Sequence, residues 1–471
     1  MLAQHIENKI SARLGDTPTE GQISFIKLVS HFILKDDDDE IFLLTGYAGT
    51  GKTTVISALI GVLEEYKLKT LLMAPTGRAA KVLSNFSGKA AYTIHKKIYR
   101  QKSSKDGFGK FVLGKNISTG QLFIVDEASM IGTHTTDLSI FGSGNLLEDL
   151  LEFVYSGKRC KLILIGDSAQ LPPVNLPESN ILNKENLKSL GFSVTATNLT
   201  EVVRQSKKSG ILFNSTLIRE QLDSVNIKLP KLNLENFGDI RRISGNELID
   251  EINSSYEKLG IEETIVITRS NKRANLYNSG IRKSILFREE MISQDDYLMV
   301  VKNNYFWLAG ESEADFIANG DIVQVVKLKK YEERFGFHFV DARLRLVDMG
   351  NREIDVKIIL ETLSIEGAAL SQDDNKKLFY SIYEDYKNIK PKRAGFDAVR
   401  NNSYFNALQV KFSYAVTCHK AQGGQWKSVF VDQGYFVQDM LNKEYLKWLY
   451  TAFTRATEKL YLVNFSKEFF E

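Results

Sequence analysis

The sequence predicts an α/β fold built on two parallel β-sheets, each interrupted by an inserted segment. The main observation is two sets of apolar runs of strand length separated by helical stretches. Strands that are buried on both faces of a parallel sheet read as nearly continuous apolar runs. The runs are 41–45, 70–74, 121–125 and 161–165 in the first set, and 264–268, 411–416, 428–431 and 459–463 in the second.

Length and composition set the class of protein. The 471 residues suggest about three domains at roughly 150 residues each. Hydrophobic residues at 43% and charged residues at 25% exclude global disorder, and the net charge of +3 indicates no dominant field. Cys160 and Cys418 cannot form a disulfide framework, and the six histidines show no zinc spacing. With no apolar run of signal-peptide or membrane-span length, we expect a cytoplasmic protein without a membrane partner.

A phosphate-binding loop is the most specific motif. Residues 46–53, Gly-Tyr-Ala-Gly-Thr-Gly-Lys-Thr, match G-x-x-x-x-G-K-[ST] between the run 41–45 and a helical stretch at 54–66. Backbone N–H groups and a helix N-terminus favour phosphate there, with Lys52 on the β/γ-phosphates and Thr53 on Mg²⁺. The motif therefore predicts ATP and Mg²⁺ as cofactors. The candidate binding residues are Gly46, Ala48, Gly49, Thr50, Gly51, Lys52, Thr53 and Thr54.

Two further strand ends carry groups that phosphoryl transfer needs. Asp126 and Glu127 follow the run 121–125, where Asp126 would hold Mg²⁺ and Glu127 would polarise the attacking water. The alternative is that the pair caps a helix. Gln170 follows the run 161–165, and its amide would contact the γ-phosphate or the water. Asp167, at the same strand end, is on the simpler interpretation a turn cap.

Gln22 and the second sheet supply the remaining nucleotide candidates. Gln22 either recognises adenine through its amide or closes a capping box with Thr19, and both interpretations stay open. Arg455 and Arg204 could act on the γ-phosphate as arginine fingers, worth roughly 10³ to 10⁵ in rate, although an arginine taken by itself is more often a surface residue. Gly424, in a Gly-Gly-Gln segment without the loop's lysine, is a further cofactor-binding candidate. A site shared between two units would open and close with hydrolysis, as a motor requires.

These segments, in this order from Gln22 to Arg455, resemble superfamily 1 helicases of the RecD-like group. Val203 precedes Arg204 where many members have tyrosine, which removes the expected ring for adenine stacking. The resemblance implies two RecA-like domains and 5′-to-3′ movement on single-stranded DNA. It also assigns the family's motifs to these segments. The Q motif is Gln22, motif I is 46–53, motif Ia is 74–83, motif II is 126–127, motif III is 166–173, motif IV is Arg204, motif V is 416–423 and motif VI is 450–456.

Polar clusters beside predicted strand ends are the candidate contacts with DNA phosphates. Backbone N–H groups and hydroxyls at such points bind the backbone without reading sequence. A lone histidine or threonine is usually structural, so the individual contacts rest on the resemblance. The candidates are Pro75, Thr76, Arg78, Thr93 and His95 in the first unit, and Thr417, His419 and Lys420 in the second.

Residues 96–115 contain seven basic residues against the single acidic Asp106. Asp106-Gly107 is a hairpin-turn signal, and we expect Phe108 and Phe111 to be exposed aromatic residues that bind DNA. A basic hairpin with exposed aromatics resembles a strand-separating pin. The alternative is a solvated loop.

We expect four parts. They are a RecA-like domain 1A with the ATP site (1–95 and 121–205), a pin hairpin 1B (96–120), a RecA-like domain 2A (206–288 and 396–471), and a small β-barrel with a helical part, 2B (289–395). The predicted function is a monomeric, ATP-dependent 5′-to-3′ DNA helicase of replication, repair or recombination. It would act on single strands and junctions, with single-strand-binding or replication proteins as possible partners. The alternatives are a translocase that displaces proteins or acts on RNA, and a nucleotide switch without motor activity.

Overall fold

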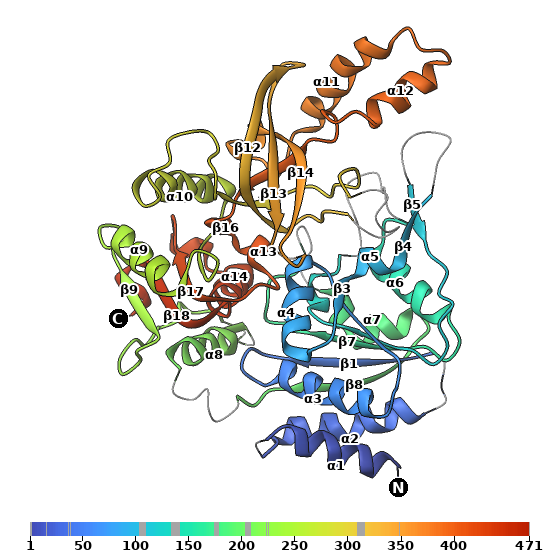
Figure 1. Ribbon diagram of the computed structural model, residues 1–471. Helices are drawn as coiled ribbons and strands as arrows, with labels where there is room; N and C mark the ends of the chain where they lie inside the picture. Colours follow the sequence, from blue (N-terminus) through green and yellow to red (C-terminus); the bar gives the residue numbers. More distant parts are fainter. Residues whose placement is uncertain are drawn as a thin grey trace.

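The computed structural model of the chain describes residues 2–470, with gaps in that range. The gaps are 16, 36, 38, 103–109, 133–141, 174–178, 203–208, 223, 225, 309–315 and 348. Figure 1 shows two α/β units side by side, with a barrel above them.

The first unit is a six-stranded parallel sheet with helices on both faces. Its strand order is β3-β2-β6-β7-β1-β8, confirming the predicted parallel sheet. The strands are β1 (Glu40–Gly46), β2 (Thr70–Ala74), β3 (Ala91–Thr93), β6 (Leu122–Val125), β7 (Lys161–Gly166) and β8 (Ser193–Leu199). The helices are α1 (Leu2–Arg13), α2 (Glu20–Leu34), α3 (Lys52–Glu65), α4 (Gly77–Ser87), α5 (Ile94–Ile98), α6 (Leu146–Tyr155) and α7 (Lys184–Ser189).

Alternate side chains of the first sheet enter two separate cores. Phe42 and Leu44 of β1 pack with α1, α2 and α3, whereas Ile41 and Leu43 pack with α5, α6 and α7. Both sets are buried, which explains why the sequence shows continuous apolar runs rather than alternation. Because all six strands are parallel, their carboxyl ends lie at one edge of the sheet, where α/β proteins place their ligands.

The second unit is a five-stranded parallel sheet of order β16-β10-β17-β18-β9. One face packs against α8 and α14, and the other joins a core that continues into the barrel. The strands are β9 (Ile240–Ile243), β10 (Thr264–Thr268), β16 (Ala415–Thr417), β17 (Trp426–Asp432) and β18 (Ala456–Val463). The helices are α8 (Gly210–Leu222), α9 (Leu248–Leu259), α10 (Asn271–Ser284), α13 (Cys418–Ala421) and α14 (Lys443–Phe453).

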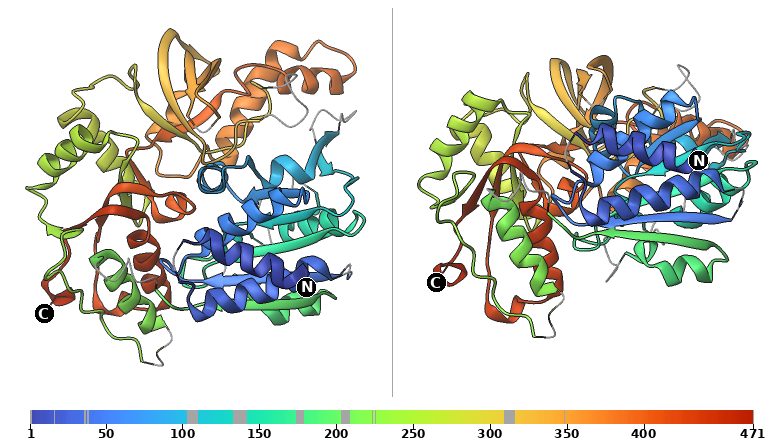
Figure 2. Two further views of the ribbon diagram at one scale, coloured as in Figure 1. Left: turned by 60° about the horizontal axis from the view of Figure 1, so that its bottom comes forward. Right: turned by 90° about the horizontal axis from the view of Figure 1, so that it is seen from below.

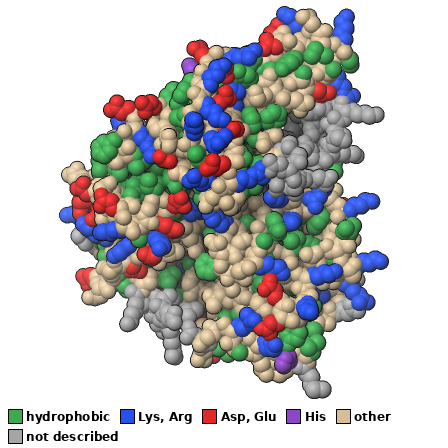
Figure 3. Space-filling view, in the orientation of Figure 1, with side chains coloured by type: hydrophobic (Ala, Val, Ile, Leu, Met, Phe, Trp, Pro, Cys, Tyr) green, Lys and Arg blue, Asp and Glu red, His purple; other side chains and the backbone are tan. Residues whose placement is uncertain are grey.

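A closed five-stranded barrel interrupts the second unit, as predicted, and a helical arm of α11 and α12 projects from it (Figures 1 and 2). Figure 3 shows Lys and Arg side chains along its outer strands. Several of these pair with acids, as Arg343 does with Asp355 at 2.9 Å. The elements are β11 (Tyr297–Val300), β12 (Ile322–Arg334), β13 (Phe337–Leu346), β14 (Arg352–Ile359), β15 (Leu408–Phe412), α11 (Gln372–Tyr383) and α12 (Lys392–Arg400).

The barrel extends further along the chain than the predicted segment 289–395. The sequence predicts one strand over 411–416, but the structure contains two, because β15 closes the barrel and β16 enters the sheet. Only Ser413 and Tyr414 separate them, and both strands are buried, so the sequence shows one apolar run across two different sheets.

The predicted hairpin of the first unit is present as β4 (Tyr99–Lys102) paired antiparallel with β5 (Lys110–Leu113). The Tyr99 hydroxyl donates to Asp149 of α6 at 2.6 Å, which anchors the base of the hairpin. The predicted turn Asp106-Gly107 and Phe108 lie outside the described residues.

Short 3-10 helices connect several elements: η1 (Ala128–Met130), η2 (Asn180–Leu182), η4 (Leu360–Leu363), η5 (Glu384–Tyr386), η6 (Gln438–Met440) and η7 (Lys467–Phe469). None of the described helices combines the length and the apolar character that crossing a lipid bilayer requires.

A buried carboxylate joins the barrel to the second unit. Asp296 is fully buried and lies 2.7 Å from Arg288 and 3.1 Å from Arg282 of α10. It also accepts from the Tyr414 hydroxyl at 2.8 Å and the Ser293 N–H at 2.7 Å. Because these donors surround one anion, the junction depends on its charge.

Replacing Asp296 with Asn should therefore destabilise the second unit by about 3–5 kcal/mol, because two arginines lose their buried counter-charge. Urea unfolding followed by circular dichroism measures the change. Asp295→Asn is the matched control, since Asp295 is exposed and has φ 64°, a conformation that asparagine tolerates. Equal stabilities of the two variants would contradict this role for Asp296.

Candidate active site

The phosphate-binding loop joins the end of β1 to the start of α3. Gly49 (φ 74°) and Gly51 (φ 82°) adopt left-handed backbone conformations that favour glycine. A Cβ added to Gly46 would lie 2.9 Å from the Leu199 Cβ, so this position also requires glycine. The Thr50 hydroxyl donates to the Tyr47 carbonyl at 2.7 Å and closes the loop around the N-terminus of α3. The loop thus presents helix N–H groups to an anion.

Lys52 and Thr53 open helix α3 at this loop. The Lys52 Nζ donates to the carbonyls of Gly46 at 2.7 Å and Tyr47 at 2.9 Å, and lies 3.9 Å from Asp167 Oδ2. Thr53 is half-buried in the first turn, and Thr54 beside it is exposed. The lysine is therefore held over the loop by backbone carbonyls, within reach of a phosphate that entered the loop.

Asp126 and Glu127 follow β6 at the same sheet edge. The Asp126 Oδ1 accepts from the Glu127 N–H at 2.8 Å. Burial raises the pKa of Asp126 to about 6, and the neighbouring Glu127 carboxylate adds to the rise. Glu127 has φ 52°, a strained conformation that costs about 1–3 kcal/mol and is typical of functional positions.

Thr53 and Asp126 suit a magnesium ion. Mg²⁺ prefers a few oxygen ligands from the protein together with phosphate and water, rather than a cage of protein groups. Thr53 offers a hydroxyl and Asp126 a carboxylate. Among the described residues, no three His, Cys, Asp or Glu gather into a metal cluster.

The loop after β7 adds a buried acceptor. Asp167 is 1% exposed, and its Oδ1 accepts from the Ala169 N–H at 2.9 Å, so the turn-capping interpretation describes its local role. Gln170 is also buried, and within the described part of the chain its Oε1 has no hydrogen-bond partner. A buried amide oxygen without a partner is suited to a water molecule or a ligand.

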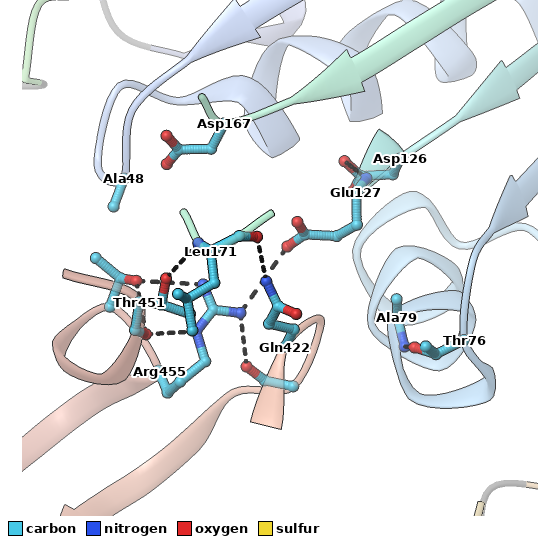
Figure 4. Close-up of polar contacts among 12 residues, drawn as sticks. Ala48, Thr76, Ala79, Asp126, Glu127, Asp167, Leu171, Gln422, Thr451 and Arg455 are labelled. Carbon is cyan, nitrogen blue, oxygen red and sulfur yellow. Dashed lines mark hydrogen bonds and ion pairs between the residues drawn. The ribbon is translucent and has the colours of Figure 1, made fainter. Parts of the chain in front are cut away.

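Arg455 reaches this edge from the second unit (Figure 4). It is 3% exposed, and its Nη1 lies 3.9 Å from the Glu127 Oε1. The same Nη1 donates to the Gly424 carbonyl at 3.2 Å, Nε donates to the Thr451 carbonyl at 3.1 Å, and Nη2 donates to the Thr454 hydroxyl at 3.2 Å. Gly424 therefore supports Arg455 through its backbone oxygen. Arg204 lies outside the described residues.

Two contacts that sequence reasoning missed fasten the units together at the site. The Leu171 N–H donates to the Thr451 hydroxyl at 2.8 Å, and the Gln422 amide donates to the Leu171 carbonyl at 2.6 Å (Figure 4). The second unit therefore binds both the N–H and the carbonyl of Leu171, the residue after Gln170. Thr451 and Gln422 fall inside the matched segments 450–456 and 416–423, but their types alone did not indicate contacts across the interface.

Gln22 forms the capping box that the sequence offered as one interpretation. Its Oε1 accepts from the Thr19 N–H at 3.1 Å, and its own N–H donates to the Thr19 hydroxyl at 3.3 Å. The side-chain Nε2 donates to the Thr50 carbonyl at 3.2 Å. Gln22 therefore connects α2 to the phosphate-binding loop.

Three residues that are predicted to contact DNA lie where a strand ends and a helix begins. The Thr76 hydroxyl accepts from the Ala79 N–H at 3.2 Å at the start of α4, directly after Pro75. The Thr93 hydroxyl accepts from the Lys96 N–H at 3.2 Å at the start of α5. Thr417 directly precedes α13. The first and second units meet here, since a Cβ added to Gly423 would lie 2.7 Å from the Ala79 Cβ.

Arg78 faces the second unit. Its guanidinium lies over the Trp426 ring at 4.1 Å from the centroid, and it donates to the Gln425 carbonyl at 3.3 Å. These contacts give Arg78 a role between the units, apart from the DNA contact that the sequence predicts.

Burial shifts the pKa of three predicted DNA contacts. It lowers the pKa of His95 to about 4 and also lowers the pKa of His419, so both rings are neutral at pH 7. Burial, with the nearby Lys411, lowers the pKa of Lys420 to about 8. Burial likewise lowers the pKa of Lys411 to about 8. Lys420, on α13, and Lys411, on β15, therefore lie close enough for their positive charges to repel.

The prediction that Phe111 is exposed is wrong. Its side chain is 9% exposed, and its ring packs 4.2 Å from that of Tyr305, on the segment after β11. An apolar ring at the base of a short hairpin is buried more readily against a neighbouring subdomain than left in water. Phe111 therefore ties the hairpin to the barrel.

Comparisons with known proteins match both units. An AAA domain family matches residues 27–229, and a UvrD-like helicase C-terminal domain family matches residues 412–463. The ATP-dependent RecD2 DNA helicase of Deinococcus radiodurans is 33% identical over 177 residues, which are 36% of this chain and 21% of that protein. The ATP-dependent DNA helicase dda of Enterobacteria phage T4 is 25% identical over 342 residues, 70% of each chain.

Solved structures of Pif1 helicases align with nearly the whole chain. The Pif1 helicase from Bacteroides, in complex with ADP-AlF3 and single-stranded DNA, is 16% identical with a TM-score of 0.46. The alignment spans 97% of this chain and 95% of that one.

The position of Arg455 predicts a catalytic effect across the interface. Arg455→Ala should lower kcat for ATP by about 10³-fold or more, because charge at the γ-phosphate is no longer stabilised. Arg455→Lys should also fail, since a point charge lacks the planar fork. Steady-state turnover and nucleotide-free DNA binding are measured on the same preparations. If DNA binding collapsed while hydrolysis survived, the finger assignment would be excluded.

Proposed function

We propose that this chain, which resembles the RecD-like superfamily 1 helicases and the phage Dda helicase among them, is an ATP-driven DNA helicase. It moves 5′ to 3′ along single-stranded DNA and separates the duplex ahead of it. The observation that carries the proposal is the shared site. The phosphate-binding loop and Glu127 belong to the first unit, and Arg455, 3.9 Å from Glu127, belongs to the second.

Each site residue has a task in hydrolysis. Lys52 binds the β/γ-phosphates, and Glu127 polarises the attacking water. Gln170 offers its unpartnered amide oxygen to the attacking water, or its amide N–H to the γ-phosphate, and Arg455 stabilises charge from the other side. Thr53 and Asp126 hold Mg²⁺, which when bound neutralises charge on the phosphates. The Gln22 amide is already hydrogen-bonded to the Thr19 N–H and the Thr50 carbonyl. Gln22 can therefore recognise adenine only if it gives up one of these hydrogen bonds.

Two sets of phosphate contacts convert hydrolysis into movement. Thr76 and Thr93 hold the DNA backbone on the first unit, while Thr417, His419 and Lys420 hold it on the second. The units meet at the ATP site through Leu171, so a change there alters the separation of the two sets. Because the contacts are to phosphates, binding is expected to be blind to base sequence.

The hairpin is the element that divides the strands. The Tyr99–Asp149 hydrogen bond fixes its base to the first unit, and the Phe111–Tyr305 contact holds β5 against the barrel subdomain. Phe108 is the residue that we assign to stacking on the terminal base pair, an exchange worth roughly 1–3 kcal/mol per base.

We assign the four predicted parts to these tasks, with the barrel part extended to residue 412. Domain 1A holds the nucleotide, 1B separates strands, 2A supplies Arg455, and 2B connects the hairpin to the second unit. The substrates are single strands and junctions of single and double strands, and the protein acts as a monomer.

Unwinding of 5′-tailed and 3′-tailed DNA and RNA duplexes tests the proposal. We expect ATP-dependent unwinding of 5′-tailed DNA only. Lys52→Ala should abolish it, and Glu127→Gln should abolish it while retaining ATP binding. Single-strand translocation without strand separation would indicate the protein-displacing alternative. Unwinding that persisted in both variants would disprove the assigned site.

Lys420 gives a pH dependence with a definite sign. Its pKa of about 8 in the free protein would rise on contact with a phosphate, because an anion favours the charged amine. Binding then takes up a proton above pH 8, so affinity for single-stranded DNA should fall between pH 7 and 9 and stay flat below pH 7.

Titrating a labelled oligonucleotide at constant ionic strength measures this dependence. Lys420→Arg is the control, because an arginine keeps its charge and should flatten the decline. An identical decline in the variant would exclude Lys420 as the titrating contact.

A further inference from the structure

A tyrosine of the second unit places its hydroxyl inside the phosphate-binding loop of the first. Tyr450, on α14, is 1% exposed. Its hydroxyl oxygen accepts from the Ala48 N–H at 2.7 Å, and its O–H donates to the Asp167 Oδ2 at 2.7 Å. Ala48 is the third residue of the loop, and Asp167 follows β7, so one hydroxyl joins two strand ends of the nucleotide site.

Packing alone does not account for this hydroxyl. A phenylalanine would fill the same space, whereas burying a hydroxyl is costly unless both its donor and its acceptor functions are satisfied. Here both partners belong to the ATP site. One of them, the Ala48 N–H, lies among the backbone donors that such loops direct at phosphates. Burial raises the pKa of Tyr450 well above its usual value, so the hydroxyl keeps its proton.

The carboxylate oxygen that accepts from this hydroxyl also lies near the loop lysine. The Asp167 Oδ2 that accepts from Tyr450 is 3.9 Å from the Lys52 Nζ. A buried carboxylate that lost its hydroxyl donor would seek another partner, and the Lys52 ammonium is 3.9 Å away. Without the hydroxyl, Lys52 would be drawn toward Asp167 and away from the phosphate.

The same helix carries the other groups that cross the interface. Thr451, the next residue, receives the Leu171 N–H at 2.8 Å, and Arg455, just beyond the helix, lies 3.9 Å from Glu127. Fixing Tyr450 at the loop therefore fixes the end of α14 relative to the first unit, and with it the distance from Arg455 to Glu127.

We propose that Tyr450 is a positioning residue for ATP hydrolysis, and this inference rests on the proposed function. Its hydroxyl holds the end of α14 against Ala48 and Asp167, keeps Lys52 free for the phosphates, and sets Arg455 opposite Glu127.

Tyr450→Phe is the test, because it removes one oxygen and keeps the ring. We expect kcat of DNA-stimulated ATP hydrolysis to fall about tenfold or more, the effect of one lost hydrogen bond to a charged group. The melting temperature should change little. Tyr445→Phe is the matched control, since Tyr445 is equally buried in α14 but packs against Phe436 and Phe469. It should keep wild-type kcat.

A second variant identifies the cause of the loss. Asp167→Asn in the Tyr450→Phe background removes the charge that would attract Lys52, so it should recover part of kcat. No recovery, an unchanged kcat in Tyr450→Phe, or a loss of kcat matched by a large fall in melting temperature would each overturn the inference. Lys52→Ala is run in parallel. If ATP hydrolysis is lost in Lys52→Ala but unchanged in Tyr450→Phe, the inference about Tyr450 is overturned and the proposed function stands. An inactive wild type would overturn the proposed function as well.

Discussion

The hydrogen bonds on the Leu171 main chain are the interaction on which the rest of the arrangement depends. Thr451 and Gln422 of the second unit bind its N–H and carbonyl, directly after Gln170, whose buried amide oxygen has no hydrogen-bond partner among the described residues. Leu171 lies in the loop that follows β7, so these hydrogen bonds join the main chain of the first unit to side chains of the second. The second unit carries Arg455 and the barrel. The Leu171 hydrogen bonds therefore also set the positions of both relative to the first unit.

Electrostatics explains why such a site needs both units. The strand ends of the first sheet bring together Asp126, Glu127 and Asp167, three carboxylates at the edge where a polyphosphate would bind. An additional anion is unfavourable there unless cations accompany it. Lys52 supplies one positive charge from the loop, Mg²⁺ would supply two, and Arg455 supplies one from across the interface. Stabilisation of the phosphates is therefore tied to the approach of the units.

Much of the fold could be predicted because parallel strands leave a strong local signal. Both sheets, the hairpin and the barrel were expected, and Lys52, Asp126, Glu127 and Gln170 do converge at one sheet edge. The sequence could not separate β15 from β16, because two buried strands in different sheets read as one apolar run. It also misjudged Phe111, since burial by a subdomain two hundred residues away leaves no local pattern.

Contacts between the units were beyond local reasoning for a similar reason. The partner of Arg78 is Trp426, and the partners of Leu171 are Thr451 and Gln422, all more than 200 residues away along the chain. Residue type alone says nothing about such pairings. The capping box of Gln22 was visible because its partner is three residues away, which is the range over which sequence patterns are informative.

The central claim is that nucleotide state sets the separation of the two units. Electron spin resonance between labels on cysteines introduced at Lys188 of α7 and Lys258 of α9 measures that separation directly, because both positions are exposed and lie on different units (Figure 1). The native Cys160 and Cys418 are buried. The account predicts that a non-hydrolysable ATP analogue shortens the distance and that ADP restores it. Identical distance distributions in all nucleotide states would contradict it.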